Sequence, residues 1–211
     1  MAAGSGGIRY NDSTKRIQLM DTEKNWVDWK HYDAYAQFQF LAESVSGSFN
    51  YTFTNPGLYI YVGAGSCINA AINPTTNASY KVLYTASSKC FVTSIVASGD
   101  DYITSTFSTA NNTGVALFYI GSTLTNTTLI QGKHSYDTTV SITMDNCINK
   151  VLVGYSGANQ RTLSYSCTTA QQYVKSNVFA CCTTLYEEGS ASMSVYGYNN
   201  GCPVVAEIQL S

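Results

Sequence analysis

Few residues of this chain have the types and spacing that catalysis or metal binding requires. A histidine-based metal site needs two or three converging ligands. The two histidines, His31 and His134, are far apart in the sequence, and neither is beside a cluster of cysteines or carboxylates. A serine nucleophile needs a strained turn and a positioned base and acid, whereas residues 63–67 (Gly-Ala-Gly-Ser-Cys) are better interpreted as a glycine-rich strand end. We therefore predict no metal, no cofactor and no catalytic residue.

Paired carboxylates could in principle hydrolyse a glycosidic bond. The candidates are Asp100-Asp101, Glu187-Glu188, Asp137 and Asp145. Each candidate falls between strand-like segments, where acidic residues are usually solvated turn residues. Phosphate-binding loops and dinucleotide fingerprints are absent from the sequence. We expect the protein not to be an enzyme.

The seven cysteines favour buried, reduced thiols over a disulfide framework. Their number is odd, their spacing is irregular, and no Cys-x-x-Cys motif occurs. Buried free cysteines behave as small hydrophobic residues. One or two disulfides remain the alternative. The residues concerned are Cys67, Cys90, Cys147, Cys167, Cys181, Cys182 and Cys202.

Composition excludes several classes of partner. Charged residues make up 11% of the chain, against about 25% in an ordinary soluble protein, and Ser, Thr and Asn supply the polarity. The net charge of −2 and the absence of basic clusters argue against nucleic acid. No apolar run is long enough to predict membrane insertion, and residues 1–7 lack the features of a signal peptide. The five Asn-x-Ser/Thr sequons, beginning at Asn11, Asn50, Asn77, Asn111 and Asn126, are expected from composition alone.

The elements that would position any site are predicted to be strands. Residues 49–54 alternate apolar and polar side chains, and Pro56-Gly57 predicts a tight turn. Residues 58–62 then carry apolar side chains on both faces, which is typical of a sandwich interior or a subunit interface. Many of the 17 tyrosines are expected to be half-buried strand residues, and a tyrosine-bearing sugar-binding loop remains open.

Short strands separated by turn residues continue along the chain and predict an all-β fold. Residues 31–46 are ambiguous, because helical spacing competes there with alternation. No internal repeat is evident. The predicted strands are 8–10, 16–20, 26–29, 49–54, 58–63, 80–85, 89–97, 102–107, 114–120, 138–143, 149–155, 162–167, 173–184, 190–196 and 203–210. We predict an N-terminal β-meander attachment segment at residues 1–35 and a jelly-roll-like β-sandwich head at residues 36–211.

Two stretches resemble known proteins. The pattern of residues 8–11 (Ile-Arg-Tyr-Asn), 17–19 (Ile-Gln-Leu) and 25–27 (Asn-Trp-Val) is similar to a short module of bacteriophage fibre and other virion proteins. Phe53 followed by residues 56–60 (Pro-Gly-Leu-Tyr-Ile) resembles a strand of C1q- and TNF-like jelly-roll heads. Those heads are trimers whose aromatic strands pack about a three-fold axis. Because a shared fold does not imply a shared function, this resemblance implies architecture alone.

These observations predict a non-enzymatic bacteriophage virion structural protein, a head or tail fibre subunit for host-surface attachment or virion decoration. It would be a homotrimer located in the virion and assembled in the bacterial host cytoplasm. Its N-terminal segment would bind other virion proteins, and a host-surface glycan is left open as a partner of the head. The alternatives are a bacterial carbohydrate-binding or adhesin module and a polysaccharide-degrading enzyme.

Overall fold

The computed structural model separates the chain into two compact units, Met1–Ala34 and Tyr35–Ser211. The boundary predicted from sequence lies one residue later. The structure describes residues 8–11, 13, 16–20, 26–28, 39–45, 47–65, 73–86, 89–107, 113–122, 124–146, 149–156, 162–167, 171–175, 179–184, 190–197 and 201–211.

The N-terminal unit contains a three-stranded antiparallel sheet in the order β1-β2-β3. Its strands are β1 (Ile8–Asn11), β2 (Arg16–Met20) and β3 (Trp26–Asp28), close to the predicted ranges. One face is held together by polar contacts across the strands. The Arg9 side chain donates from Nε to Gln18 Oε1 at 2.8 Å, and its guanidinium carbon lies 4.4 Å from the ring centroid of Trp26.

The head is built from strands alone among the described residues, which confirms the predicted all-β sandwich class. Four antiparallel sheets form it, in the orders β5-β10-β7, β4-β11-β6-β9-β8, β12-β19-β14-β17-β16 and β13-β18-β15. The first eight strands are β4 (Gln39–Ser44), β5 (Ser48–Thr52), β6 (Gly57–Ala64), β7 (Asn73–Thr76), β8 (Ser79–Ala86), β9 (Cys90–Ala97), β10 (Tyr102–Thr106) and β11 (Gly114–Gly121). The second eight are β12 (Thr127–His134), β13 (Thr139–Met144), β14 (Lys150–Tyr155), β15 (Thr162–Cys167), β16 (Gln171–Lys175), β17 (Phe179–Thr184), β18 (Ala191–Tyr196) and β19 (Val204–Leu210).

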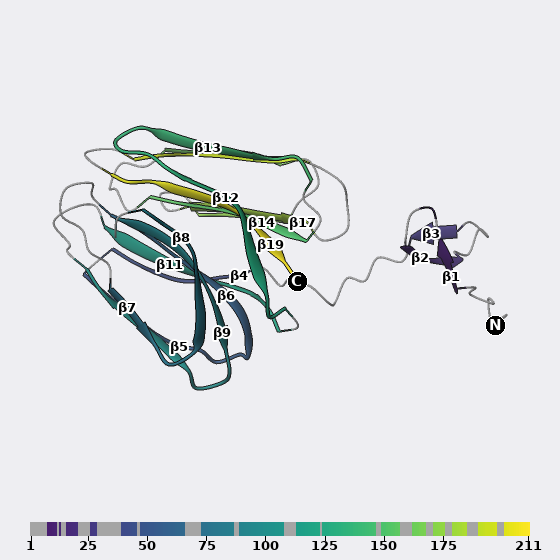
Figure 1. Ribbon diagram of the computed structural model, residues 1–211, viewed down its shortest axis with the longest axis horizontal. Coiled ribbons are helices and arrows are strands. Elements are labelled where there is room, and N and C mark those ends of the chain that lie inside the picture. Colours follow the sequence, from purple (N-terminus) through teal and green to yellow (C-terminus); the bar gives the residue numbers. More distant parts are fainter. Residues whose placement is uncertain are drawn as a thin grey trace. The chain divides into compact units, whose positions relative to one another are not determined.

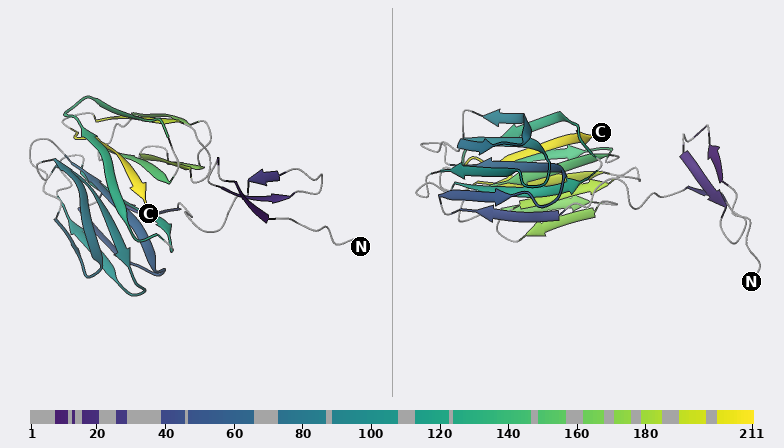
Figure 2. Two further views of the ribbon diagram at one scale, coloured as in Figure 1. Left: turned by 45° about the vertical axis from the view of Figure 1, so that its right-hand side comes forward. Right: turned by 90° about the horizontal axis from the view of Figure 1, so that it is seen from below.

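The four sheets lie in layers (Figures 1 and 2), and three hydrophobic cores lie between them. The two five-stranded sheets face each other in the middle, and a three-stranded sheet covers the outer side of each. The first outer core is aromatic, with Phe49, Phe53 and Tyr61. The opposite outer core is aliphatic and includes Ile142 and Met193. The described chain therefore forms two stacked sandwiches rather than a single pair of sheets.

The head consists of two structural repeats with the same strand order. When the strands of residues 39–121 and of residues 127–210 are each numbered from one to eight, both units have the sheet orders 1-8-3-6-5 and 2-7-4. The third strands of the two units, β6 and β14, are in contact across the central core. Contact between equivalent elements is how the two subunits of an isologous dimer pack. The head thus has the organisation of a dimer fused into one chain.

The repeat is visible in the spacing of core residues rather than in residue identity. β13 begins and β14 ends 91 residues after β5 begins and β6 ends (48 to 139 and 64 to 155). In this ungapped alignment Val62 and Val153 both occupy the central core, and Tyr61 and Leu152 both face the outer cores. Few residues in the aligned segments are identical, which explains why the sequence alone showed no repeat.

The two-sided strand β6 is buried on both faces within the chain. Leu58 and Ile60 pack in the central core, and Tyr59 and Tyr61 pack in the first outer core. This confirms the sandwich interior as one of the two predicted settings for the strand. Its apolar character therefore needs no subunit interface.

Several strands differ from the predictions. The ambiguous segment contains strand β4 at Gln39–Ser44, while residues 31–38 lie outside the described part of the chain. Strands β7 and β12 were not predicted, because β7 is four residues long with Pro74 inside it and β12 has a polar sequence with Gly132. The predicted single strand 173–184 is two strands, β16 and β17.

Candidate functional site

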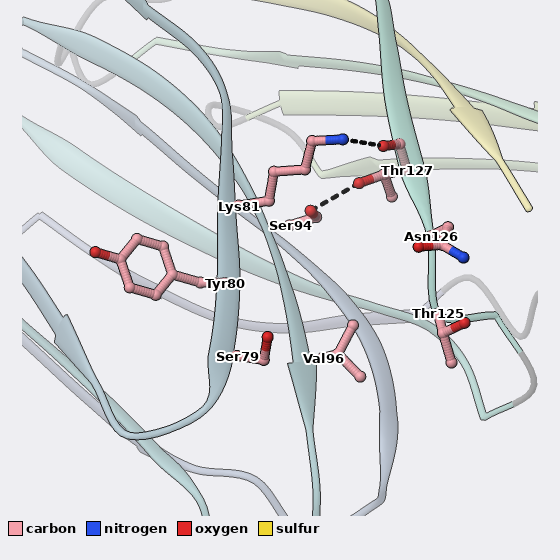
Figure 3. Close-up of a pocket in the computed structure, with 8 residues that line it drawn as sticks. All are labelled: Ser79, Tyr80, Lys81, Ser94, Val96, Thr125, Asn126 and Thr127. Atoms are coloured by element: carbon pink, nitrogen blue, oxygen red, sulfur yellow. Dashed lines mark hydrogen bonds between the residues drawn. The ribbon is translucent and has the colours of Figure 1, made fainter.

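A small pocket lies at the seam between the two repeats (Figure 3). Its volume is about 200 Å³. Strands β8 and β9 of the first repeat form one wall, and the residues that lead into β12 of the second repeat form the other. The lining residues are Ser79, Tyr80, Lys81, Ser94, Val96, Thr125, Asn126 and Thr127.

Hydrogen bonds between the two repeats hold the residues that line this seam pocket in place. The Thr127 hydroxyl donates to Ser94 Oγ at 2.7 Å, and Lys81 Nζ donates to the Thr127 carbonyl oxygen at 2.8 Å (Figure 3). Asn126 is held through its backbone, which exchanges two hydrogen bonds with Ser211 at 2.8 and 3.1 Å. The position of β12 relative to β8 is thereby set by contacts that also shape the pocket.

The pocket presents hydrogen-bonding groups to solvent. Ser79, Thr125 and Asn126 are exposed and offer hydroxyl and amide groups. Tyr80 is 60% exposed, and its ring extends away from Thr125 and Asn126 (Figure 3). The lining contains neither a carboxylate nor an imidazole, and its one charged side chain, Lys81, donates to the Thr127 carbonyl oxygen. The arrangement therefore suits hydrogen bonding to a small polar group rather than proton transfer.

A second contact between the repeats involves the histidine His134. The hydroxyl of Tyr84 in β8 lies 2.6 Å from His134 Nδ1 at the end of β12. The same tyrosine ring covers Gly132, where an added Cβ would come within 2.4 Å of the ring. His134 is half-buried at the last position of the edge strand β12, so of the two predicted settings, surface or turn, the structure excludes the turn. His31 lies outside the described residues.

The candidate carboxylates are distributed over different turns. The Asp101 carboxylate accepts hydrogen bonds from the backbone N–H and the hydroxyl of Ser98, both at 2.8 Å, in the turn after β9. Asp137 and Asp145 are exposed on either side of β13. Glu187 and Glu188 lie outside the described residues. The turn interpretation is confirmed for Asp101, whose side chain caps its own turn. Across the described part of the chain, no three His, Cys, Asp or Glu side chains gather as a metal site would require.

Two of the seven cysteines have described side chains, Cys90 and Cys202. Both are buried in the central core, and neither forms a disulfide. The prediction of buried reduced cysteines is confirmed for this pair. The glycine-rich segment lies at the end of β6, as predicted for Gly63 and Ala64, while Ser66 and Cys67 lie outside the described residues.

Buried tyrosines tie β6 to its neighbours. Burial raises the pKa of Tyr59 to about 12, and its hydroxyl donates to the Asn55 carbonyl oxygen at 2.5 Å. Burial also raises the pKa of Tyr61, whose hydroxyl lies 2.6 Å from Ser105 Oγ. These hydroxyls are used inside the sandwich, so they are structural groups.

Sequence reasoning missed a buried ion pair in the second repeat. Glu207 in β19 is 3% exposed, and its carboxylate accepts hydrogen bonds from Lys150 Nζ at 2.7 Å and from Gln131 Nε2 at 2.6 Å. In the first repeat the register gives Leu117 the position of Glu207 and Tyr59 the position of Lys150. The same fold therefore accepts apolar side chains where the second repeat has this pair.

Comparison of the chain with family models, with curated proteins and with solved structures finds no match. Within the described residues, no helix has the length and apolar character needed to span a bilayer.

Proposed function

We propose that this protein is a non-enzymatic bacteriophage virion structural protein, a head or tail fibre subunit for host-surface attachment or virion decoration. The observation that supports this proposal is the division of the chain into a 34-residue meander and a large β-sandwich head. A meander of this size is too small to bury a core of its own. Such a segment gains stability by packing against a partner.

The register of the meander indicates which face the partner would cover. Directly opposed residues share a sheet face, and the pairs Ile8–Leu19, Tyr10–Ile17 and Leu19–Val27 place five apolar residues on one face. The other face carries Arg9, Gln18 and Trp26, and the Arg9 guanidinium lies over the Trp26 ring. Burial of apolar area stabilises an interface by roughly 25 cal/mol per Å². We assign this apolar face to contacts with other virion proteins.

Deleting residues 1–34 tests the attachment role. The full chain and the truncated chain would be produced during particle assembly, and purified particles would be assayed for each by mass spectrometry. We expect a folded, soluble head that is absent from particles. A substitution on the apolar face, Leu19→Lys, should reduce incorporation, while Ser13→Lys in an exposed turn should not. Incorporation of the truncated head would refute the proposal, and its aggregation would favour a meander that covers an edge of the head.

The homotrimer remains a prediction that belongs to this proposal. The two-sided strand β6 no longer supports it, because both faces of β6 are buried within one chain. The low share of charged residues, 11% of the chain, supplies the remaining argument, because it gives copies of the chain little electrostatic repulsion. Light scattering of the full chain measures the mass directly, and a monomer at micromolar concentration would contradict the trimer.

The strand order supports a jelly-roll assignment for each repeat, as part of the same proposal. Each repeat has eight strands in two sheets, which is the composition of a jelly roll. The likeness of residues 53–60 to C1q- and TNF-like heads agrees with that assignment.

A carbohydrate-binding or adhesin module is the second candidate function. The observation that favours it is the seam pocket, with its hydroxyl and amide groups and the nearby exposed ring of Tyr80. A glycan array probed with the full chain and with Asn126→Ala tests this site. Signals that persist unchanged in the variant would exclude the pocket as the sugar-binding site.

A further inference from the structure

The outward face of the first three-stranded sheet is polar and uncharged. In β5 the inward residue Phe49 is 4% exposed, whereas its neighbours Ser48 and Asn50 are exposed. The same alternation in β10 buries Ile103. The outward positions of this sheet with described side chains are Ser48, Asn50, Thr52, Thr75, Tyr102, Thr104 and Thr106.

The outward face of the other three-stranded sheet has the same character. Strand β13 alternates buried Val140, Ile142 and Met144 with exposed polar residues, and β18 buries Met193 and Val195. The outward positions here are Thr139, Ser141, Thr143, Ser164, Ser192, Ser194 and Tyr196. Each face thus combines rows of hydroxyl groups with one tyrosine.

Charge is missing from both outer sheets. Their six strands, β5, β7, β10, β13, β15 and β18, contain no Asp, Glu, Lys or Arg. The central sheets do carry charges, for example Glu43 in β4 and Lys133 in β12. A designed soluble surface aims for about 25–35% charged residues, and the average over this whole chain is 11%. An uncharged outer sheet in both repeats therefore needs an explanation beyond solubility.

The chemistry of these faces matches a neutral polysaccharide. Hydroxyl and amide groups exchange hydrogen bonds with sugar hydroxyls. Desolvating a charge is costly, and a sugar chain on these uncharged faces would desolvate none. A tyrosine ring adds a flat apolar surface for the sugar ring. Outward residues recur at about 6.6–6.8 Å along a strand and 4.7–4.9 Å between strands, so a chain of sugar residues would meet polar groups along its length.

We propose that both outer faces bind a neutral polysaccharide chain, which gives one head two binding faces on opposite sides of the layered sandwich (Figure 1). This inference rests on the proposed attachment role and names its ligand class. Two faces on one head raise the avidity for a surface that repeats the same polymer, without any additional contact.

Affinity electrophoresis of the full chain tests the proposal. Native gels would contain one of four neutral polysaccharides, namely an α-glucan, a β-glucan, a β-mannan or a galactan, with anionic alginate as the charged control. We expect retardation by at least one neutral polymer. Tyr102→Ala and Tyr196→Ala should each weaken the apparent affinity by about tenfold, an upper value for one aromatic contact, and the double variant should weaken it further. The matched control is Tyr136→Ala, which removes an exposed tyrosine from the turn between β12 and β13 and should change nothing.

Adding charge provides a second test that leaves the fold intact. Asn50→Asp and Ser164→Asp each place a carboxylate at an exposed position of one face. If the faces are merely solvated, neither the melting temperature nor the gel mobility shift with polysaccharide will change. If they bind a neutral chain, the retardation will fall while the melting temperature stays constant.

Besides unchanged retardation of the two aspartate variants, three results would overturn the inference. The first is that none of the four neutral polymers retards the protein. The second is that retardation is unchanged in both tyrosine variants. The third is that Asn126→Ala abolishes retardation, because that result would assign binding to the seam pocket. Failure of the proposed virion role is detected separately. That failure appears as incorporation of the truncated head into particles, whereas the gel assay uses the full chain in solution.

Discussion

Replacing Glu207 by leucine should destabilise the head strongly, although the first repeat has leucine at the equivalent position. The Glu207 side chain is 4% exposed and faces the Lys150 amine, which is 18% exposed, at 2.7 Å. The substitution removes two charge-assisted hydrogen bonds, one from Lys150 and one from Gln131. Each is worth about 1.5–3 kcal/mol, and removal of one partner of a buried pair costs about 3–5 kcal/mol. We expect a loss of about 3–5 kcal/mol in the free energy of unfolding.

The double variant Lys150→Met/Glu207→Leu should recover most of that loss. Hydrophobic residues of similar volume in place of a buried ion pair are often neutral or stabilising, by up to about 4 kcal/mol. The first repeat shows that this position of the fold accepts apolar packing, with Leu117 and Tyr59 in the equivalent places. Lys150→Met alone should also cost several kcal/mol, because Glu207 then keeps its charge in a buried position.

Urea unfolding of the four proteins, the parent, the two single variants and the double variant, measures these differences. The midpoint and slope give each free energy, and the double-mutant cycle gives the coupling between the two side chains. A double variant as unstable as Glu207→Leu would refute the reasoning, because it would show that shape rather than charge decides the site. Single variants that cost under about 1 kcal/mol would show that the pair behaves as a solvated surface pair.

Three further predictions concern buried groups. The folded pKa of Tyr59, about 12, is above the unfolded value of about 10, so its neutral form contributes stability that is complete below pH 10 and is lost as the pH rises through 12. Absorbance titration should show tyrosines that ionise only when the protein unfolds, and simple ionisation of every tyrosine near pH 10 would contradict this. Cys90 and Cys202 should react with a thiol reagent slowly in the native state and rapidly in denaturant, with a melting temperature that reducing agent leaves unchanged. Gly57→Ala should destabilise by about 1–3 kcal/mol, since φ is +142° and the added Cβ would lie 2.4 Å from the Gly121 carbonyl oxygen, while Gly99→Ala, with open space around it, is the control.

Much of the fold could be predicted because it depends on local patterns. Alternation in residues 49–54 and the turn at Pro56-Gly57 placed β5 and β6 within a residue or two of their observed bounds. Strand β12 was missed because it lies at a sheet edge, where half its residues face solvent and the apolar signal is weak. The order of the sheet layers could not be predicted. An apolar strand face indicates that another element covers it, but the sequence does not identify which sheet that is.

The candidate sites were harder to predict than the strands. The seam pocket joins residues 79–81, 94–96 and 125–127, which no motif connects and which only the packing of one repeat on the other brings together. Glu207 lies within an otherwise ordinary strand sequence, Val-Val-Ala-Glu-Ile-Gln-Leu. A single acidic residue in a strand of this kind is predicted to be exposed. The burial of Glu207 depends on its ion pair with Lys150, which lies in a different strand.

The outer cores of the two repeats differ in composition, whereas the outward faces of both outer sheets are polar and uncharged. The first outer core is built on aromatic residues such as Phe53 and Tyr61, and the second on aliphatic residues such as Ile142 and on the Glu207 ion pair. A core tolerates such changes if volume and polarity are balanced. A face that is only solvated tolerates charge even more readily, because exposed substitutions usually change stability by less than about 0.5 kcal/mol. Two sequences that have diverged this far inside would therefore be expected to have acquired Lys or Glu outside. That both outer sheets lack charge is accounted for if each must contact the same neutral surface.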